Sequence, residues 1–122
     1  MNGATTATAL LAVYTTVASR DDAQRIARAL VERRLAACAQ IEAIESVYRW
    51  DGALQQATEF RLLLKTRAAQ YPAVEAAIRA LHPYELPAIH ALALDAVYPP
   101  YADWVRAESS GEAAGPATDP AP

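Results

Sequence analysis

Apolar and polar residues recur along the chain with two different periods, one typical of strands and the other of helices. Short apolar or alternating runs predict four strands, over residues 9–17, 38–50, 54–66 and 88–94. Apolar residues three and four positions apart predict two helices, from Ser19 to about Leu35 and over 68–81, and residues 101–107 suggest a short final helix. The predicted element order is therefore βαββαβ followed by a terminal helix.

Local signals place the ends of the helices. Ser19 lies three residues before Asp22, which resembles the capping box that starts a helix. His82 precedes a proline, and such a residue disfavours the α region, so the second helix should end there. Pro99-Pro100 predicts a break in the chain before the last helix.

This order predicts an α+β domain with the ferredoxin-like split βαββαβ arrangement. In that arrangement a four-stranded antiparallel sheet carries its helices on one face. Alternation along the third strand indicates which side is buried: Phe60, Leu62 and Leu64 face one way. Glu59 and Lys65 then face the other way.

The predicted hairpin is unusually long. Asp51-Gly52 is typical of a type I′ turn, because that turn needs positive φ at both central positions. The two arms are each about 11–13 residues long, against about 5–6 for a usual strand. The hairpin must then project beyond the sheet, with Tyr48 and Trp50 near its tip. Exposed edges and aromatic tips need cover, so we expect a homo-oligomer, and a closed ring hides all such edges at once.

Composition limits the folded domain to residues 9–108. Residues 109–122 contain no aromatic or branched aliphatic side chain, so they cannot bury enough apolar surface and are expected to form a disordered tail. Residues 1–8 are similarly weak and are expected to be flexible. The remaining length suits one domain with a single core.

Charge and cysteine content narrow the class of protein. A net charge of −3 argues against a nucleic-acid or anionic-membrane surface. No apolar run approaches the roughly 20 residues that span a bilayer. The single cysteine, Cys38, allows no intrachain disulfide, which fits a reducing cytosol. We therefore expect a cytoplasmic protein that binds neither nucleic acid nor membrane.

Familiar enzyme motifs are absent from the sequence. Gly52 is the only glycine of the predicted domain and belongs to the hairpin turn, so no glycine-rich loop cradles a phosphate. The metal-ligating side chains of the softer kind are Cys38, His82 and His90, with no pair at ligand spacing. One catalytic alternative remains, a thiol enzyme that pairs Cys38 with His82.

Residues 82–87, HPYELP, hold an imidazole, a phenol and a carboxylate in a loop stiffened by two prolines. The loop is either a rigid connection or a preorganised polar patch for binding. Glu59 and Lys65 likewise form either an ordinary ion pair on one strand face or the charged part of a binding site.

Four segments resemble the CutA family, the divalent-cation tolerance proteins. They are ERRLAACAQI (32–41), SVYRWDG (46–52), EFRLLLKT (59–66) and HPYELP (82–87), in the family's order within about 13–104. The resemblance implies a ferredoxin-like subunit in a tight homotrimer held together by the long hairpins. It also implies a role in tolerance of copper and other divalent metals, no established catalytic reaction, and an architecture similar to trimeric nitrogen-regulatory signalling proteins.

The family's characteristic positions supply the candidate site residues. The candidates for ligand binding in clefts between subunits are Cys38, Trp50, Glu59, Lys65, Tyr84 and Glu85, and His82 is the candidate metal ligand. Thr15 and Leu81 stand where some members carry a cysteine and a second histidine, residues to which copper binding is attributed. Because those soft ligands are missing, copper or another divalent metal is expected to bind only weakly. No cofactor is expected to be required.

Two functional hypotheses follow. The leading one is a non-enzymatic homotrimeric scaffold for metal response or binding. The alternative is a trimeric small-molecule signalling module that binds an anionic or metal-complexed ligand in the clefts between subunits.

Overall fold

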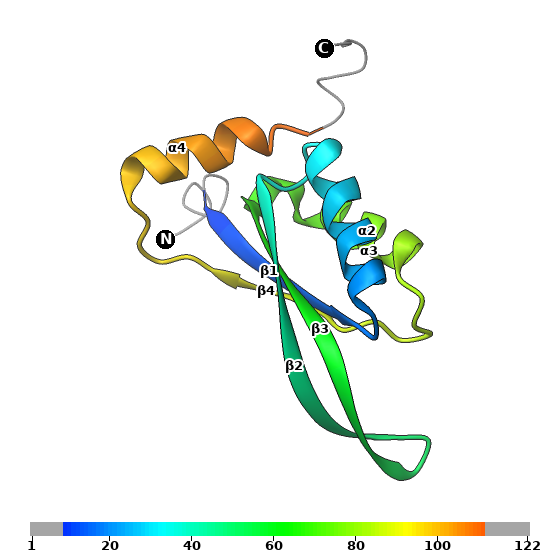
Figure 1. The fold of residues 1–122 in the computed structure, drawn as a ribbon. Coiled ribbons are helices and arrows are strands. Elements are labelled where there is room, and N and C mark those ends of the chain that lie inside the picture. Colours follow the sequence, from blue (N-terminus) through cyan, green and yellow to red (C-terminus); the bar gives the residue numbers. More distant parts are fainter. Residues whose placement is uncertain (1–8, 112–122) are drawn as a thin grey trace.

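The computed structural model describes residues 9–111 of the chain, and Figure 1 shows their arrangement. The strands are β1 (Leu10–Val17), β2 (Cys38–Trp50), β3 (Ala53–Arg67) and β4 (Ile89–Ala93). The helices are α2 (Arg20–Glu32), the short 3-10 helix η1 (Ala68–Gln70), α3 (Tyr71–Leu81) and α4 (Pro99–Glu108). The predicted element order is confirmed.

The four strands form one antiparallel sheet in the order β2-β3-β1-β4. Helices α2 and α3 lie on one face of it, and α4 lies across the end at which β1 begins (Figure 1). This is the ferredoxin-like arrangement expected from the sequence. Within the described residues, no helix is long and apolar enough to cross a membrane.

The main core fills the space between the sheet and α2 and α3. Its largest fully buried side chains come from all of these elements: Val13, Val17, Ile26, Leu30, Leu62, Leu64, Val74 and Ile78. The predicted alternation of β3 is confirmed, because Leu62 and Leu64 are buried among the helices and Phe60 packs against the same cluster. A smaller cluster under α4 contains Leu10, Ala37, Ala102 and Val105.

Helix α2 begins and ends with well-defined caps. The Ser19 hydroxyl accepts a hydrogen bond from the Asp22 N–H at 3.0 Å, as predicted. The helix ends at Glu32, before the predicted end, because Arg34 adopts a left-handed conformation with φ 59°. The Leu35 N–H then bonds the Leu30 carbonyl at 3.0 Å, the pattern of a Schellman motif. A glycine normally marks this turn, so the sequence carried no signal for it.

The hairpin projects as expected. Strand β1 pairs with β3 only from Arg67 back to Phe60, whereas β2 pairs with β3 as far as the turn. The outer halves of the two arms therefore pair only with each other. Asp51 and Gly52 have φ values of 57° and 78°, which confirms a turn with two left-handed residues.

The C-terminal part differs from the prediction in two ways. Pro99 does not break the chain before α4 but is the first residue of the helix. Proline has no backbone N–H, and at the first helical position an N–H would have no hydrogen-bond partner within the helix. Residues 109–111, placed in the disordered tail, are packed: the fully buried Ser109 accepts bonds at its carbonyl from Arg67 Nε and Gln70 Nε2. The remaining expectations, a flexible 1–8 and a disordered 112–122, lie outside the described residues.

Ser19→Ala should lower the free energy of unfolding by about 1 kcal/mol, because it removes the side-chain acceptor from the first turn of α2. Urea denaturation followed by circular dichroism measures the change. Ser19→Asp is the matched control, since it keeps a side-chain oxygen at the same position and should retain most of the stability.

Candidate functional site

The predicted site residues separate into two groups, one toward each end of β3. Lys65 pairs with Cys38 near the α4 end, whereas Glu59 pairs with Ile44 on the projecting part of the hairpin. Lys65 lies six positions after Glu59 along the strand, a span of roughly 20 Å. The two charges therefore form neither an ion pair with each other nor one site within a single chain. The expected ordinary ion pair between Glu59 and Lys65 is therefore wrong, whereas their place in a cleft between subunits stays a prediction.

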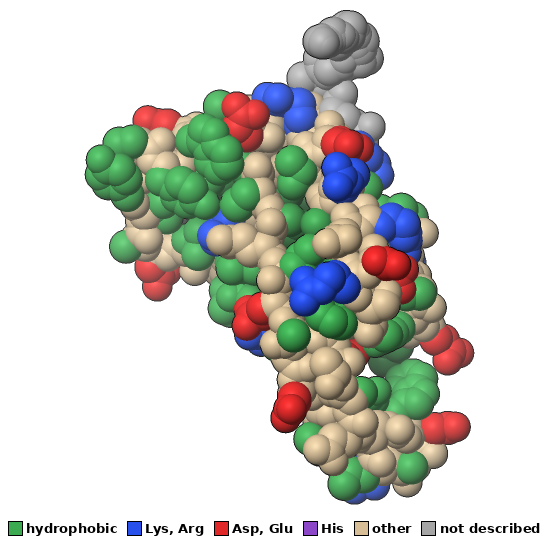
Figure 2. Space-filling view, viewed as in Figure 1, with side chains coloured by type: hydrophobic (Ala, Val, Ile, Leu, Met, Phe, Trp, Pro, Cys, Tyr) green, Lys and Arg blue, Asp and Glu red, His purple; other side chains and the backbone are tan. Residues whose placement is uncertain are grey.

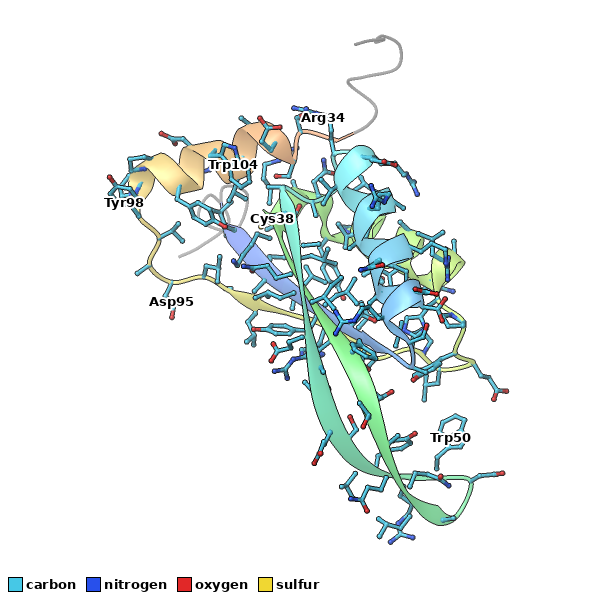
Figure 3. All side chains as sticks on the ribbon, in the orientation of Figure 1. Arg34, Cys38, Trp50, Asp95, Tyr98 and Trp104 are labelled. Carbon is cyan, nitrogen blue, oxygen red and sulfur yellow. The ribbon has the colours of Figure 1, made fainter. Side chains whose placement is uncertain are left out.

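The first group is the Cys38 cluster, made of Cys38, Lys65, Tyr101 and Trp104. The Cys38 Sγ lies 3.7 Å from the Tyr101 Oη, and the Lys65 Nζ lies 5.7 Å from the centre of the Tyr101 ring. Trp104 stacks on Tyr101 with ring centres 5.7 Å apart. Burial, and then the Cys38 contact, raise the pKa of Tyr101. Figure 3 places Cys38 and Trp104 in the same part of the molecule, far from Trp50.

The Cys38 cluster contains no histidine and no carboxylate. His82 bonds the Thr16 carbonyl, near the end of β1 that is opposite the Cys38 cluster. A thiol enzyme built on Cys38 and His82 therefore does not fit one subunit, because the base must lie within hydrogen-bond reach of the thiol.

His82 is a structural residue in this geometry. Its Nε2 lies 2.7 Å from the Thr16 carbonyl oxygen and its Nδ1 accepts the Tyr84 N–H at 3.1 Å. The second bond requires a lone pair on Nδ1, so the neutral ring carries its proton on Nε2. Burial lowers the pKa of His82, against the opposing effects of Thr16 and the carboxylates of Asp22 and Glu59.

Neither ring nitrogen of His82 is therefore free to ligate a metal without breaking a hydrogen bond. Among residues 9–111, no group of three or more histidine, cysteine or acidic side chains is close enough to hold a metal ion. Thr15 is buried and its hydroxyl lacks a hydrogen-bond partner among the described residues. The described side chains of one chain thus offer no ready-made metal centre.

The second group surrounds a cavity of about 250 Å³, called here the hairpin-end cavity. Its walls are Tyr48, Trp50, Tyr84, Glu85 and Leu86. The first two come from β2 and the others from the connection between α3 and β4, so the cavity lies between the hairpin and that loop. Figure 3 shows Trp50 on the side of the hairpin tip that faces the loop.

Tyr84 and Glu59 connect the loop to the hairpin. The Tyr84 hydroxyl donates to Glu59 Oε2 at 2.5 Å, and Glu59 is only 6% exposed. Burial and this bond raise the pKa of Tyr84, so the phenol stays protonated and remains a donor. A second cavity of about 480 Å³ adjoins this pair and is also lined by Glu45.

Of the six candidate ligand-binding residues, the structure brings Trp50, Tyr84 and Glu85 to one cavity, with Glu59 nearby. Their role in ligand binding stays a prediction. It missed Tyr101, which is central to the Cys38 cluster, and Leu86. The signal for Tyr101 was weak, since it looks like any apolar residue on the buried face of a short helix.

Known proteins share this architecture. The CutA1 divalent ion tolerance protein family matches residues 11–108. The divalent-cation tolerance protein CutA of Archaeoglobus fulgidus is 37% identical over 93 residues, which cover 76% of this chain and 91% of that protein. The CutA homolog of Xenopus laevis is 42% identical over 97 residues, or 79% of this chain and 64% of that protein. The solved structure of the divalent cation tolerance protein from Thermus thermophilus has a TM-score of 0.79 at 40% identity and covers 82% of this chain and 98% of its own.

The fold and the site define a small ferredoxin-like α+β subunit with a projecting hairpin. Its described residues form a polar and aromatic cavity and no metal-ligand cluster. With these relatives beside that geometry, the chain belongs to the CutA1 divalent ion tolerance protein family.

Tyr84→Phe should lower the free energy of unfolding by about 1.5–3 kcal/mol, because Glu59 then keeps a buried carboxylate without its phenol donor. Urea denaturation measures the loss. Tyr14→Phe is the matched control, since the Tyr14 ring stacks on His90 through contacts that phenylalanine retains. Equal transition midpoints for the two variants would show that the buried bond adds no net stability.

Stability should fall between about pH 7 and pH 5 through His82. Its pKa is lower in the folded chain than its ordinary 6.5, so the unfolded state takes up a proton first and acid favours unfolding. His82→Gln should flatten this part of the pH profile of the thermal midpoint. An unchanged profile in His82→Gln would contradict the prediction.

Proposed function

We propose that the chain works as a homotrimeric, non-enzymatic binding scaffold in the cytoplasmic response to divalent metals. The projecting hairpin carries this proposal. Its arms expose large apolar side chains, with Val47 63% and Leu54 70% accessible in a single chain. An isolated two-stranded hairpin is marginal in water, so the arms need a partner that covers them.

Other surfaces support a partner made of copies of the same chain. Strand β2 is an edge of the sheet, and beside it a groove of about 430 Å³ runs between β2 and α2. Exposed apolar side chains also gather on and near α4, where Figure 2 shows a green patch; they include Leu92, Tyr98 and Trp104. A closed threefold ring would cover an edge and an apolar patch in every subunit at once.

The relation to metal is proposed to be weak or indirect. The described part of a single chain holds no cluster of metal ligands, and both nitrogens of His82 are engaged. Thr15 and Leu81 supply neither a thiolate nor an imidazole. Copper or another divalent ion would then bind with low affinity at the surface or between subunits, with no required cofactor.

A small-molecule signalling role is the second candidate, and the hairpin-end cavity favours it. As expected from the sequence, this candidate binds an anionic or metal-complexed ligand in clefts between subunits, with Glu59 and Lys65 supplying both charges. Their separation along β3 argues against that ligand at the hairpin end, where the lining of the two cavities carries carboxylates and no lysine or arginine among the described residues.

Native mass spectrometry of the purified chain tests the assembly and metal content together. We expect a trimer at micromolar concentration that retains no stoichiometric metal after incubation with Cu(II) or Zn(II) and desalting. A monomer would overturn the scaffold proposal. A trimer that keeps three metal ions, and loses them in His82→Ala, would overturn the weak or indirect role of metal.

Leu54→Asp should shift the assembly toward monomer, because it places a charge within the apolar surface that the partner is proposed to cover. Sedimentation velocity measures the species present. Ala73→Asp is the matched control: it adds the same charge at an exposed position in the first turn of α3, where the helix dipole tolerates it. The control should remain trimeric.

A further inference from the structure

The hairpin-end cavity combines three aromatic side chains with neighbouring carboxylates. From this combination we infer that it binds the head group of a small quaternary ammonium compound. This ligand differs in kind from the divalent metals of the proposed function. The inference requires the folded and assembled chain but does not require metal binding. The inference and the proposed role in metal response can therefore fail separately.

The aromatic residues approach the cavity from two segments. Tyr48 and Trp50 lie two residues apart on β2, so their side chains project from the same face of the hairpin. Tyr84 lines the same cavity from the α3–β4 connection. Aromatic faces attract a cation that lies within about 6 Å of the ring centre, and tryptophan does so most strongly. Three such rings around one cavity are the arrangement that recognises methylated ammonium groups.

The size of the cavity fits a head group and not a larger ligand. Its volume of about 250 Å³ lies below the ~300–1,000 Å³ typical of pockets for drug-sized molecules. The ligand's remaining part would extend into solvent or into the adjoining cavity of about 480 Å³, with which it shares Tyr48, Tyr84 and Leu86.

The charges around the site favour a cation. Glu85 lines the hairpin-end cavity, and Glu45 and Glu59 line the adjoining one. No lysine or arginine lines either cavity within residues 9–111. Arg49 lies between the two β2 aromatics but projects from the opposite face of the strand. A positive head group would therefore meet carboxylates with no competing cation in the described lining.

The loop side of the cavity is held in place before any ligand arrives. The Tyr84 hydroxyl bonds Glu59 and its backbone N–H bonds His82. Its ring also packs edge-on against the His82 ring, with ring centres 4.8 Å apart. A wall fixed at three points loses little conformational freedom when a ligand binds.

A bare metal ion fits the same place less well. A divalent cation needs several ligand atoms around one point, and no such cluster of side chains exists in residues 9–111. A quaternary ammonium group has no hydrogen-bond donor and needs no coordinating atoms. It is attracted by aromatic rings and by carboxylates at longer range, and both kinds of side chain line the cavity.

Isothermal titration calorimetry of the full-length protein with choline tests the inference. The control ligand is the neutral isostere, in which a tert-butyl group replaces the trimethylammonium group. We expect saturable binding of choline and at least about tenfold weaker binding of the isostere, since only the charge differs. Equal binding of the two, or no binding of choline at millimolar concentration, would overturn the inference.

Trp50→Leu should weaken choline binding by about tenfold, because it keeps an apolar side chain but removes the best ring face. Trp104→Leu is the matched control, because both tryptophans are 44% exposed and Trp104 lies outside the cavity. The variant keeps an apolar side chain in the patch at α4, and sedimentation velocity checks that its assembly is that of the unsubstituted chain. Trp50→Phe should retain part of the affinity, which guards against a folding defect in the leucine variant. Equal affinity of Trp50→Leu and Trp104→Leu would overturn the assignment of the site.

The same head group occurs in free metabolites and on lipids. Co-sedimentation with phosphatidylcholine vesicles distinguishes these sources. Choline binding without vesicle binding would assign the cavity to free quaternary ammonium compounds. Vesicle binding that choline competes away, and that Trp50→Leu abolishes, would assign it to the lipid head group.

Discussion

The antiparallel pairing of β2 with β3 continues beyond the end of β1, and most of the functional geometry depends on this continuation. Inside the sheet, β3 has β2 on one side and β1 on the other. Between Phe60 and the turn, β3 pairs only with β2. The two strands therefore project from the sheet with both outer edges unpaired. The α3–β4 loop contacts one side of this ribbon. Since such a ribbon is marginally stable alone, neighbouring subunits are proposed to cover the rest. The same projection carries Tyr48 and Trp50 to the place where they meet that loop.

The bond between Tyr84 and Glu59 fixes one side of this arrangement. It places a carboxylate that is 6% exposed under the hairpin and gives it a neutral phenol as donor. The negative charge near the cavity is therefore built into the fold and not left to mobile surface side chains. With no lysine or arginine in the described lining, this end of the molecule is suited to cations, whereas Lys65 stands at the other end beside Tyr101.

Single residues show how far the candidate site could be predicted. HPYELP was singled out as either a rigid connection or a polar binding patch because its residue types and prolines are local properties. In the structure, its Tyr84 and Glu85 line a cavity. Glu59 and Lys65 share a strand face, as alternation predicts, but their spacing along β3 already places them roughly 20 Å apart, too far for an ion pair. His82 looked like a metal ligand by type, yet its two nitrogens are occupied by Thr16 and Tyr84, contacts that no spacing in the sequence reveals.

The sequence by itself determined the elements, their order and the projecting hairpin, because periodicity, the Ser19 cap and the Asp51-Gly52 turn act through neighbouring residues. Even there it erred where a local signal was missing, as at Arg34, which makes a left-handed helix end without glycine. Only the tertiary structure decided which side chains meet. The partition into a Cys38 cluster and a hairpin-end cavity arises from strand register and from the path of the α3–β4 loop. The register and the loop path depend on packing between segments that are distant in the chain. A pattern of neighbouring residues carries no information about the energy of that packing.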